Sequence, residues 1–137
     1  MSKRSSDLSS KISESVMLVE PDVLVRMTVA DYLRECGYRV VEAMTGEEAL
    51  SMLGGGVKVD AILSAVKLRG AIDGFALAQR IREDFGGVEV ILTTGYAMTA
   101  KKAGALCDQG PRRRPYHSDL IVERLKLLFE KHRPKSG

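Results

Sequence analysis

The amino-acid sequence predicts an α/β fold in which a parallel sheet carries helices on both of its faces. Short apolar segments, such as residues 16–19 and 59–65, are typical of strands that are buried in a parallel sheet. Each segment is followed, after a short turn, by apolar residues at helical spacing. Four such strand–helix repeats predict right-handed crossovers and a doubly wound sheet.

Start and stop signals for helices separate the expected strands, which are residues 16–19, 38–42, 59–65 and 88–94. Pro21 or Asp22 opens the first helix, and Gly37 is placed to end it. A capping box of Thr45 and Glu48 starts the second helix. The remaining signals are the glycines at 54–56, the pair Asp73-Gly74 and the pair Gly86-Gly87.

The apolar positions of the expected helices identify a candidate core. In the first helix they are Val25, Val29, Tyr32, Leu33 and Cys36. In the second and third helices they are Ala49, Leu50, Leu53, Leu77, Ile81 and Phe85. The last helix, which Ser118 can cap, carries Ile121, Val122, Leu125, Leu128 and Phe129.

The periodic pattern weakens after residue 95. Residues 98–107 predict a fourth helix that Gly104 interrupts. Residues 108–115 stand where a fifth strand would follow, but they are polar, basic and proline-bracketed, which disfavours a regular strand. We expect a short or distorted edge strand there, or a loop.

Composition predicts one globular domain at residues 15–132 of the 137-residue chain, because 45% of the residues are hydrophobic and 28% are charged. Residues 1–14 are polar and lack the apolar segment of a secretory signal, so we expect a disordered lead-in. Residues 133–137 form a basic tail. No apolar run reaches the roughly 18 residues of a membrane span. A net charge of +3 does not by itself indicate a nucleic-acid-binding protein.

The two cysteines, Cys36 and Cys107, lie far apart in the sequence and have no metal-binding spacing. Each falls in an expected helix, so we predict that both are small buried thiols. Free thiols fit a reducing cytoplasm.

Several short motifs follow one another in a recognisable order. They are Met17-Leu18-Val19-Glu20, Leu24-Val25-Arg26-Met27, Gly37-Tyr38-Arg39-Val40-Val41-Glu42-Ala43, Gly46-Glu47-Glu48-Ala49-Leu50, Asp73-Gly74, Val90-Ile91-Leu92-Thr93-Thr94-Gly95-Tyr96-Ala97 and Pro115-Tyr116. The ordered set resembles the receiver domain of bacterial two-component response regulators over about residues 16–129. This resemblance implies a flavodoxin-like (βα)5 fold, here with a weak or distorted fifth strand.

The resemblance also implies a position for a phosphoacceptor pocket. In receivers, an aspartate at the end of the third strand takes a phosphoryl group from a histidine kinase. Two acids after the first strand help it to bind Mg²⁺, and a Ser or Thr and a Lys contact the phosphoryl oxygens. The residues at or beside these positions here are Glu20, Pro21, Asp22, Ser64, Ala65, Thr94 and Arg114.

This chain departs from the receiver pattern where the chemistry is decisive. Ala65 stands at the phosphoacceptor position and has no nucleophilic atom. Pro21 replaces one acid of the pair, and Arg114 replaces the lysine with a cation of different geometry. Thr94 matches the Ser/Thr position. The sequence therefore predicts a degenerate pocket that is not phosphorylated on aspartate.

Metal and nucleophile candidates at this pocket are correspondingly few. Glu20 plainly remains as a carboxylate and Asp22 is a partial substitute, but helix capping is the favoured role of both, so we expect no Mg²⁺ site and no cofactor. Ser64 is a poor replacement nucleophile because no histidine lies nearby to act as a base. The absence of a glycine-rich loop after the first strand argues against a nucleotide-binding enzyme.

The resemblance implies partner contact or dimerisation through the fourth helix, the fifth strand and the last helix. The candidate contact residues there are Lys101, Lys102, Arg112, Arg113 and Tyr116. This basic surface favours an acidic partner, such as a histidine kinase, a phosphotransferase or another regulator. Nucleic-acid binding is less favoured because no aromatic residues interleave with the arginines.

Taken together, the residues and the resemblance predict a stand-alone, non-enzymatic signalling domain of the cytoplasm that acts by protein–protein interaction. Two alternatives stay open. One is an active phosphoacceptor that uses a non-standard site. The other is a nucleic-acid-binding module that uses Arg112, Arg113 and Arg114.

Overall fold

The computed structural model describes residues 14–110, 121 and 123–127. Its centre is a parallel sheet with the strand order β2-β1-β3-β4. The strands are β1 (Ser15–Val19), β2 (Arg39–Ala43), β3 (Ala61–Ala65) and β4 (Glu89–Thr93). The predicted doubly wound α/β sheet is therefore confirmed for its first four strands.

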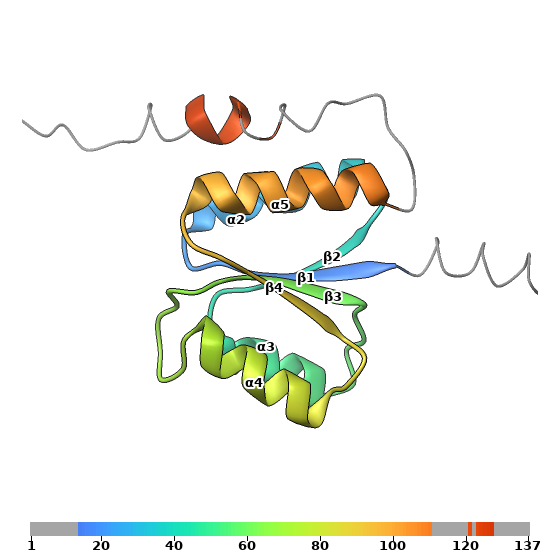
Figure 1. Cartoon of the computed structure of the whole chain (residues 1–137), viewed down its shortest axis with the longest axis vertical. Coiled ribbons are helices and arrows are strands. Elements are labelled where there is room, and N and C mark those ends of the chain that lie inside the picture. Colours follow the sequence, from blue (N-terminus) through green and yellow to red (C-terminus); the bar gives the residue numbers. More distant parts are fainter. Residues whose placement is uncertain (1–13, 111–120, 122, 128–137) are drawn as a thin grey trace, which may run out of the picture.

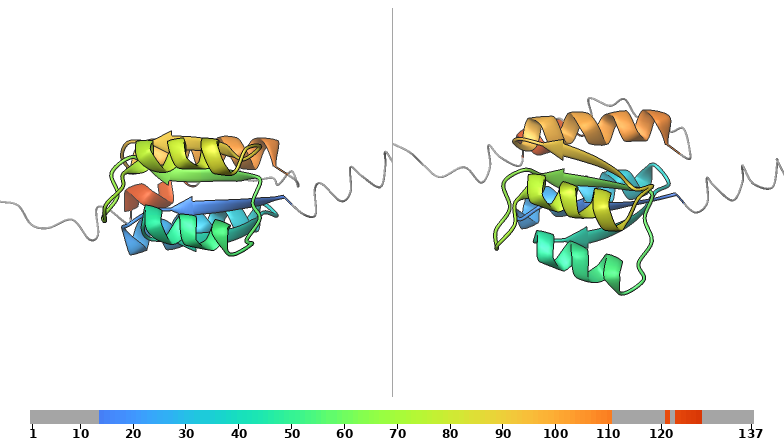
Figure 2. Two further views of the ribbon diagram at one scale, coloured as in Figure 1. Left: turned by 90° about the horizontal axis from the view of Figure 1, so that it is seen from below. Right: turned by 60° about the horizontal axis from the view of Figure 1, so that its bottom comes forward.

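Helices cover both faces of this sheet (Figure 1). They are α2 (Val23–Glu35), α3 (Gly46–Gly54), α4 (Gly74–Asp84) and α5 (Tyr96–Gln109). Helices α2 and α5 lie over one face, and α3 and α4 lie over the other; the right-hand view of Figure 2 shows the same separation. None of the described helices is long and apolar enough to cross a membrane.

The central strand β1 joins two hydrophobic layers. All five of its residues are buried, and they alternate between the layers because successive side chains of a strand point to opposite faces. Val16 and Leu18 pack with α2 and α5, whereas Met17 and Val19 pack with α3 and α4. Burial on both faces explains why this strand reads as a continuous apolar run.

Side-chain caps begin three helices at the predicted places. The Asp22 carboxylate accepts hydrogen bonds from the backbone N–H groups at the start of α2, and the Asp73 carboxylate caps α4 in the same way. The Thr45 hydroxyl accepts from the Glu48 N–H, while the Glu48 carboxylate reaches back to the N–H of Met44. Sequence alone therefore located these helix starts well.

Helix α5 differs from its expected form. It runs without interruption through Gly104, which is one of the buried residues on its inner side. Burial of α5 at this position offsets the low intrinsic helix propensity of glycine. Packing therefore outweighs propensity at this position.

The cysteine prediction is wrong about the chemical state. Cys36 at the end of α2 and Cys107 in the last turn of α5 form a disulfide, with a Cα–Cα distance of 5.6 Å. Both are buried, as expected. The two residues are 71 positions apart, and only the packing of α5 beside α2 brings them together.

Several expectations fall outside the described residues. They concern the lead-in up to residue 13, the fifth-strand region at 111–120, the Ser118 cap and the basic tail. Within the last predicted helix, residues 121 and 123–127 are helical, and Ile121 and Leu125 are buried against α2 as their spacing predicts.

Candidate functional site

A cavity of about 480 Å³ opens at the carboxyl ends of β1, β3 and β4. In open α/β sheets, ligands bind at this edge because the strand order reverses there and the flanking loops diverge. Most of the cavity wall is apolar. Its lining residues are Glu20, Pro21, Asp22, Val25, Ala65, Val66, Lys67, Thr93, Thr94, Gly95 and Tyr96.

Ala65 is the residue that β3 presents to this cavity. It pairs in register with Thr93, at the last position of both strands. The preceding residue, Ser64, is 1% exposed, and its hydroxyl donates to the Ala65 carbonyl oxygen over 2.9 Å. The structure thus places a methyl group in the cavity and the serine hydroxyl outside it.

The loop after β3 is held tightly behind Ala65. Gly74 donates its N–H to the Val66 carbonyl oxygen over 2.7 Å. A Cβ atom on Gly74 would lie 2.4 Å from the Ala65 carbonyl oxygen, so only glycine allows the start of α4 to approach β3 this closely. This contact fixes the backbone of the position where a receiver carries its nucleophile.

The acidic side of the cavity consists of Glu20 and Asp22. The Glu20 carboxylate accepts from the N–H of Asp22 over 3.0 Å. Desolvation by burial raises the pKa of Glu20, the Asp22 N–H hydrogen bond lowers it, and the neighbouring Asp22 carboxylate raises it. One Asp22 oxygen already accepts two N–H groups, from Leu24 and Val25. Both acids are therefore occupied with the start of α2.

Arg26 connects this acidic turn to the neighbouring strand. Its guanidinium donates to the Glu20 backbone carbonyl over 2.8 Å and to the Glu42 carboxylate over 3.3 Å. The Arg26 side chain is 11% exposed, so the pair with Glu42 is well shielded from solvent. This bridge holds the end of β1 against β2 and α2.

The threonine side of the cavity comes from the turn between β4 and α5. Thr93 is buried, and its hydroxyl lies 2.8 Å from that of Thr99. Thr94 is exposed and lines the cavity, as the family position predicts. Its N–H contacts the Met98 sulfur at 3.3 Å.

Sequence reasoning missed Lys67, which also lines the cavity. It is exposed and lies two residues after Ala65, in the loop that leads to α4. Its position directly after a strand that ends at the ligand edge is the signal that could have identified it. Lys67 supplies a cation to the described cavity wall, whereas Arg114 lies outside the described residues.

The residues present do not fit a receiver-type Mg²⁺ site. Mg²⁺ prefers octahedral oxygen coordination, usually with carboxylates of the protein. Of the three carboxylate positions, Ala65 and Pro21 supply none and Glu20 supplies one, while the neighbouring Asp22 uses its Oδ1 atom to cap α2. Within residues 14–110 and the described part of the last helix, no three acidic, histidine or cysteine side chains gather as a metal site.

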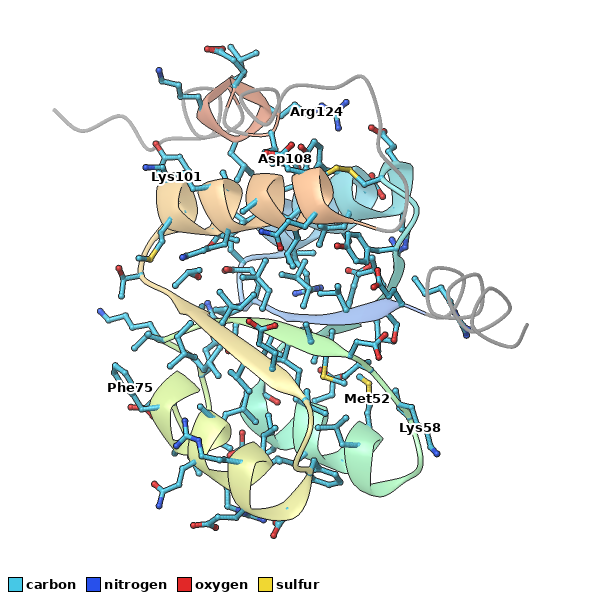
Figure 3. All side chains as sticks on the ribbon, turned by 45° about the vertical axis from the view of Figure 1, so that its right-hand side comes forward. Met52, Lys58, Phe75, Lys101, Asp108 and Arg124 are labelled. Atoms are coloured by element: carbon cyan, nitrogen blue, oxygen red, sulfur yellow. A yellow bond between two sulfur atoms is a disulfide. The ribbon has the colours of Figure 1, made fainter. Side chains whose placement is uncertain are left out.

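The predicted partner-binding residues divide into two groups. Lys101 and Lys102 are exposed on α5, and Figure 3 shows Lys101 on the outer side of that helix. Arg112, Arg113 and Tyr116 lie outside the described residues. The structure therefore places a basic pair on the solvent face of α5.

Comparison with known protein families identifies a match over most of the described chain. Residues 16–110 match the family described as the response regulator receiver domain. The chain therefore belongs to the receiver-domain family of response regulators.

Related proteins are larger than this chain. The sensor kinase CckA of Brucella abortus is 32% identical over 134 residues, which are 94% of this chain but 14% of that protein. The uncharacterized transcriptional regulatory protein YbdJ of Bacillus subtilis is 27% identical over 118 residues, or 85% of this chain and 51% of that protein. The chain thus spans between about one seventh and half of these curated relatives.

Solved structures of receivers share the fold. A putative response regulator from Chloroflexus aurantiacus is 27% identical with a TM-score of 0.54, and the match covers 86% of this chain and 98% of that one. The regulator TrrA from Thermotoga maritima, solved with Mg(2+)-BeF, is 24% identical with a TM-score of 0.58, covering 84% and 98%.

The buried carboxylate of Glu20 predicts a pH-dependent gain in stability for Glu20→Gln. Because burial raises the pKa of Glu20 in the folded chain, the folded state binds this proton more tightly than the unfolded state. Ionised Glu20 therefore costs stability as pH rises above the ordinary value of 4.5. Thermal melts should show Glu20→Gln more stable than the wild type at pH 7 and equal to it at pH 4. A pH-independent difference would contradict this.

The missing carboxylates predict that Mg²⁺ and beryllofluoride, a mimic of a phosphoryl group, leave the melting midpoint unchanged. A receiver that binds the pair gains stability according to its ligand affinity, by about 2.7 kcal/mol at a hundredfold excess over Kd. A receiver with an intact acid set serves as the control and should shift under the same conditions. An upward shift of several degrees in this chain would show that the pocket still binds the pair.

Proposed function

We propose that this chain is a receiver-type signalling domain that is not phosphorylated on aspartate and acts by binding other proteins. The proposal rests above all on Ala65, whose methyl group lines the cavity where a phosphoacceptor carboxylate would stand. The Gly74 contact holds this backbone in place without any side-chain nucleophile. A module with this site performs no phosphoryl transfer of its own and is not an enzyme.

The electrostatics of the cavity support the same conclusion. Phosphoryl transfer to a carboxylate requires a metal ion and a cation to balance the charge that develops on the transferred group. Glu20 and Asp22 are engaged in the turn before α2, and the wall beside them is mostly apolar. Lys67 adds a cation to the cavity wall but supplies no nucleophile.

An active phosphoacceptor at Ser64 is disfavoured. Its hydroxyl is buried and donates to the adjacent carbonyl oxygen, and it does not line the cavity. A phosphoryl donor would have to displace the end of β3 to reach it. The other alternative, nucleic-acid binding through Arg112, Arg113 and Arg114, is tested by a strongly salt-dependent shift with random DNA.

Incubation with acetyl phosphate and Mg²⁺ should leave the intact mass of the wild-type chain unchanged, because Ala65 offers no nucleophile. A receiver that retains its aspartate, treated in parallel, should gain one phosphate and shows that the donor is active. A gain of one phosphate in this chain would overturn the proposal. Restoring both acids with Pro21→Asp and Ala65→Asp tests whether these two positions account for the loss.

We further propose that α5 contributes the partner-binding surface of this domain. Lys101 and Lys102 are exposed side by side in the chain, and Met98 on the same helix is 38% exposed. A cationic pair beside an apolar side chain suits an acidic protein partner, such as a histidine kinase, a phosphotransferase or another regulator. The same surface could serve a homodimer.

Reversing both charges with Lys101→Glu and Lys102→Glu should abolish or strongly reduce capture of the native partner in a pull-down. Each rim charge contributes mainly to association, so the loss should be greatest at low salt. Lys58→Glu is compared with the single variants Lys101→Glu and Lys102→Glu, which change the net charge equally, since Lys58 is exposed near the opposite end of the molecule (Figure 3). Equal loss in the control variant would assign the effect to net charge alone.

A further inference from the structure

The fully buried residues of α5 are small, and its larger apolar residues Tyr96 and Leu106 are only partly buried. Its buried residues are Thr99, Ala100, Ala103, Gly104 and Cys107. Those of α2, by contrast, include two valines, a leucine and a tyrosine, which are Val25, Val29, Leu33 and Tyr32. Because apolar stabilisation grows with the area removed from water, α5 gains much less from its packing than α2 does.

Specific contacts fasten the two ends of α5. At its start, the Thr99 hydroxyl contacts the Thr93 hydroxyl and donates to the Gly95 carbonyl oxygen. At its end, the Tyr38 hydroxyl donates to the Leu106 carbonyl oxygen over 2.6 Å, beside the disulfide. Burial, followed by the Glu14 charge, raises the pKa of Tyr38 to about 12, so this hydroxyl remains a donor at neutral pH.

The face on which α5 lies has a topological consequence. The connections from β2 to β3 and from β3 to β4 place α3 and α4 on one face, as right-handed crossovers require. Helix α5 lies on the other face, with α2. If α5 led to a further parallel strand beside β4, the connection from β4 through α5 to that strand would be a left-handed crossover, which is disfavoured. The disulfide therefore attaches α5 to α2, on the face of the sheet opposite to the one that a right-handed connection after β4 would use.

We propose that Cys36–Cys107 is a reversible redox-modification site, reduced by a small thiol or a dithiol protein, whose reduction releases the end of α5 from α2. Both cysteines are buried, so a reductant reaches the bond when the weakly packed end of α5 opens locally. This inference concerns the conformation of α5 and holds whether or not the chain accepts a phosphoryl group.

The exchange proceeds in two balanced steps. A thiolate attacks the Cys107 sulfur, which belongs to the more accessible residue at 5% exposure against 0% for Cys36. The S–S bond breaks, Cys36 leaves as a thiolate and takes up a proton, and Cys107 carries a mixed disulfide. A second thiol then attacks the external sulfur. Cys107 is released as a thiol, and the two reductant sulfurs leave as an oxidised disulfide.

The test equilibrates the full chain in glutathione buffers of graded thiol-to-disulfide ratio, followed by thiol alkylation, intact mass and hydrogen exchange. The two cysteines should pass from bridged to doubly alkylated within the range of buffers. Amides at the end of α5 should then exchange about tenfold faster, while those of β1 keep their protection. Unchanged exchange in α5 after reduction would overturn the proposal, and so would loss of protection throughout the sheet.

Matched cysteine variants test the order of attack. Cys36→Ser keeps the more accessible thiol and should form a mixed disulfide with oxidised glutathione faster than Cys107→Ser, which keeps the buried one. The double variant should exchange rapidly in α5 at every buffer ratio, which separates the bond from any direct effect of glutathione. Failure of the wild-type cysteines to pair in any oxidising buffer, or the reverse order of reactivity, would overturn the proposed site.

Discussion

Right-handed crossovers determine where the cavity of this domain lies. In the strand order β2-β1-β3-β4, the chain passes from β1 to β2 in one direction and then to β3 and β4 in the opposite direction. Right-handed connections therefore place α2 on one face and α3 and α4 on the other. The strand order therefore reverses beside β1. The loops after β1 and β3 diverge at this point, and the cavity with Glu20 and Ala65 opens between them.

The chemistry of that cavity depends on which carboxylates stand at its wall. Two carboxylates roughly 4 Å apart repel each other by about 4 kcal/mol at an effective dielectric constant of 20. A receiver with three acids accepts this cost because a metal ion offsets it. Ala65 and Pro21 at two of those positions remove both this repulsion and two potential metal ligands. Glu20 remains, and desolvation by burial raises its pKa although the neighbouring Arg26 guanidinium lowers it.

Local patterns predicted the strands, the helix caps and the core of this fold because each depends on residues close in sequence. Asp22, Thr45 and Asp73 cap the helices that they were expected to cap. The pairing of Cys36 with Cys107 depends on α5 packing beside α2, and no local pattern encodes that choice of face. Lys67 was missed for a related reason, because only the folded structure shows that this exposed loop lysine lies at the cavity wall.

A receiver with alanine at position 65 still needs a difference between two states if it is to report a signal. Phosphorylation supplies such a difference through charge at the carboxyl edge of the sheet, close to the turn that begins α5. The disulfide acts on the opposite end of the same helix, through Cys107 and α2. Since α5 also carries Lys101 and Lys102, release of its end would alter the presentation of the basic pair to a partner. One helix thus couples the proposed redox site to the proposed binding surface without any contribution from the vacant phosphoacceptor position.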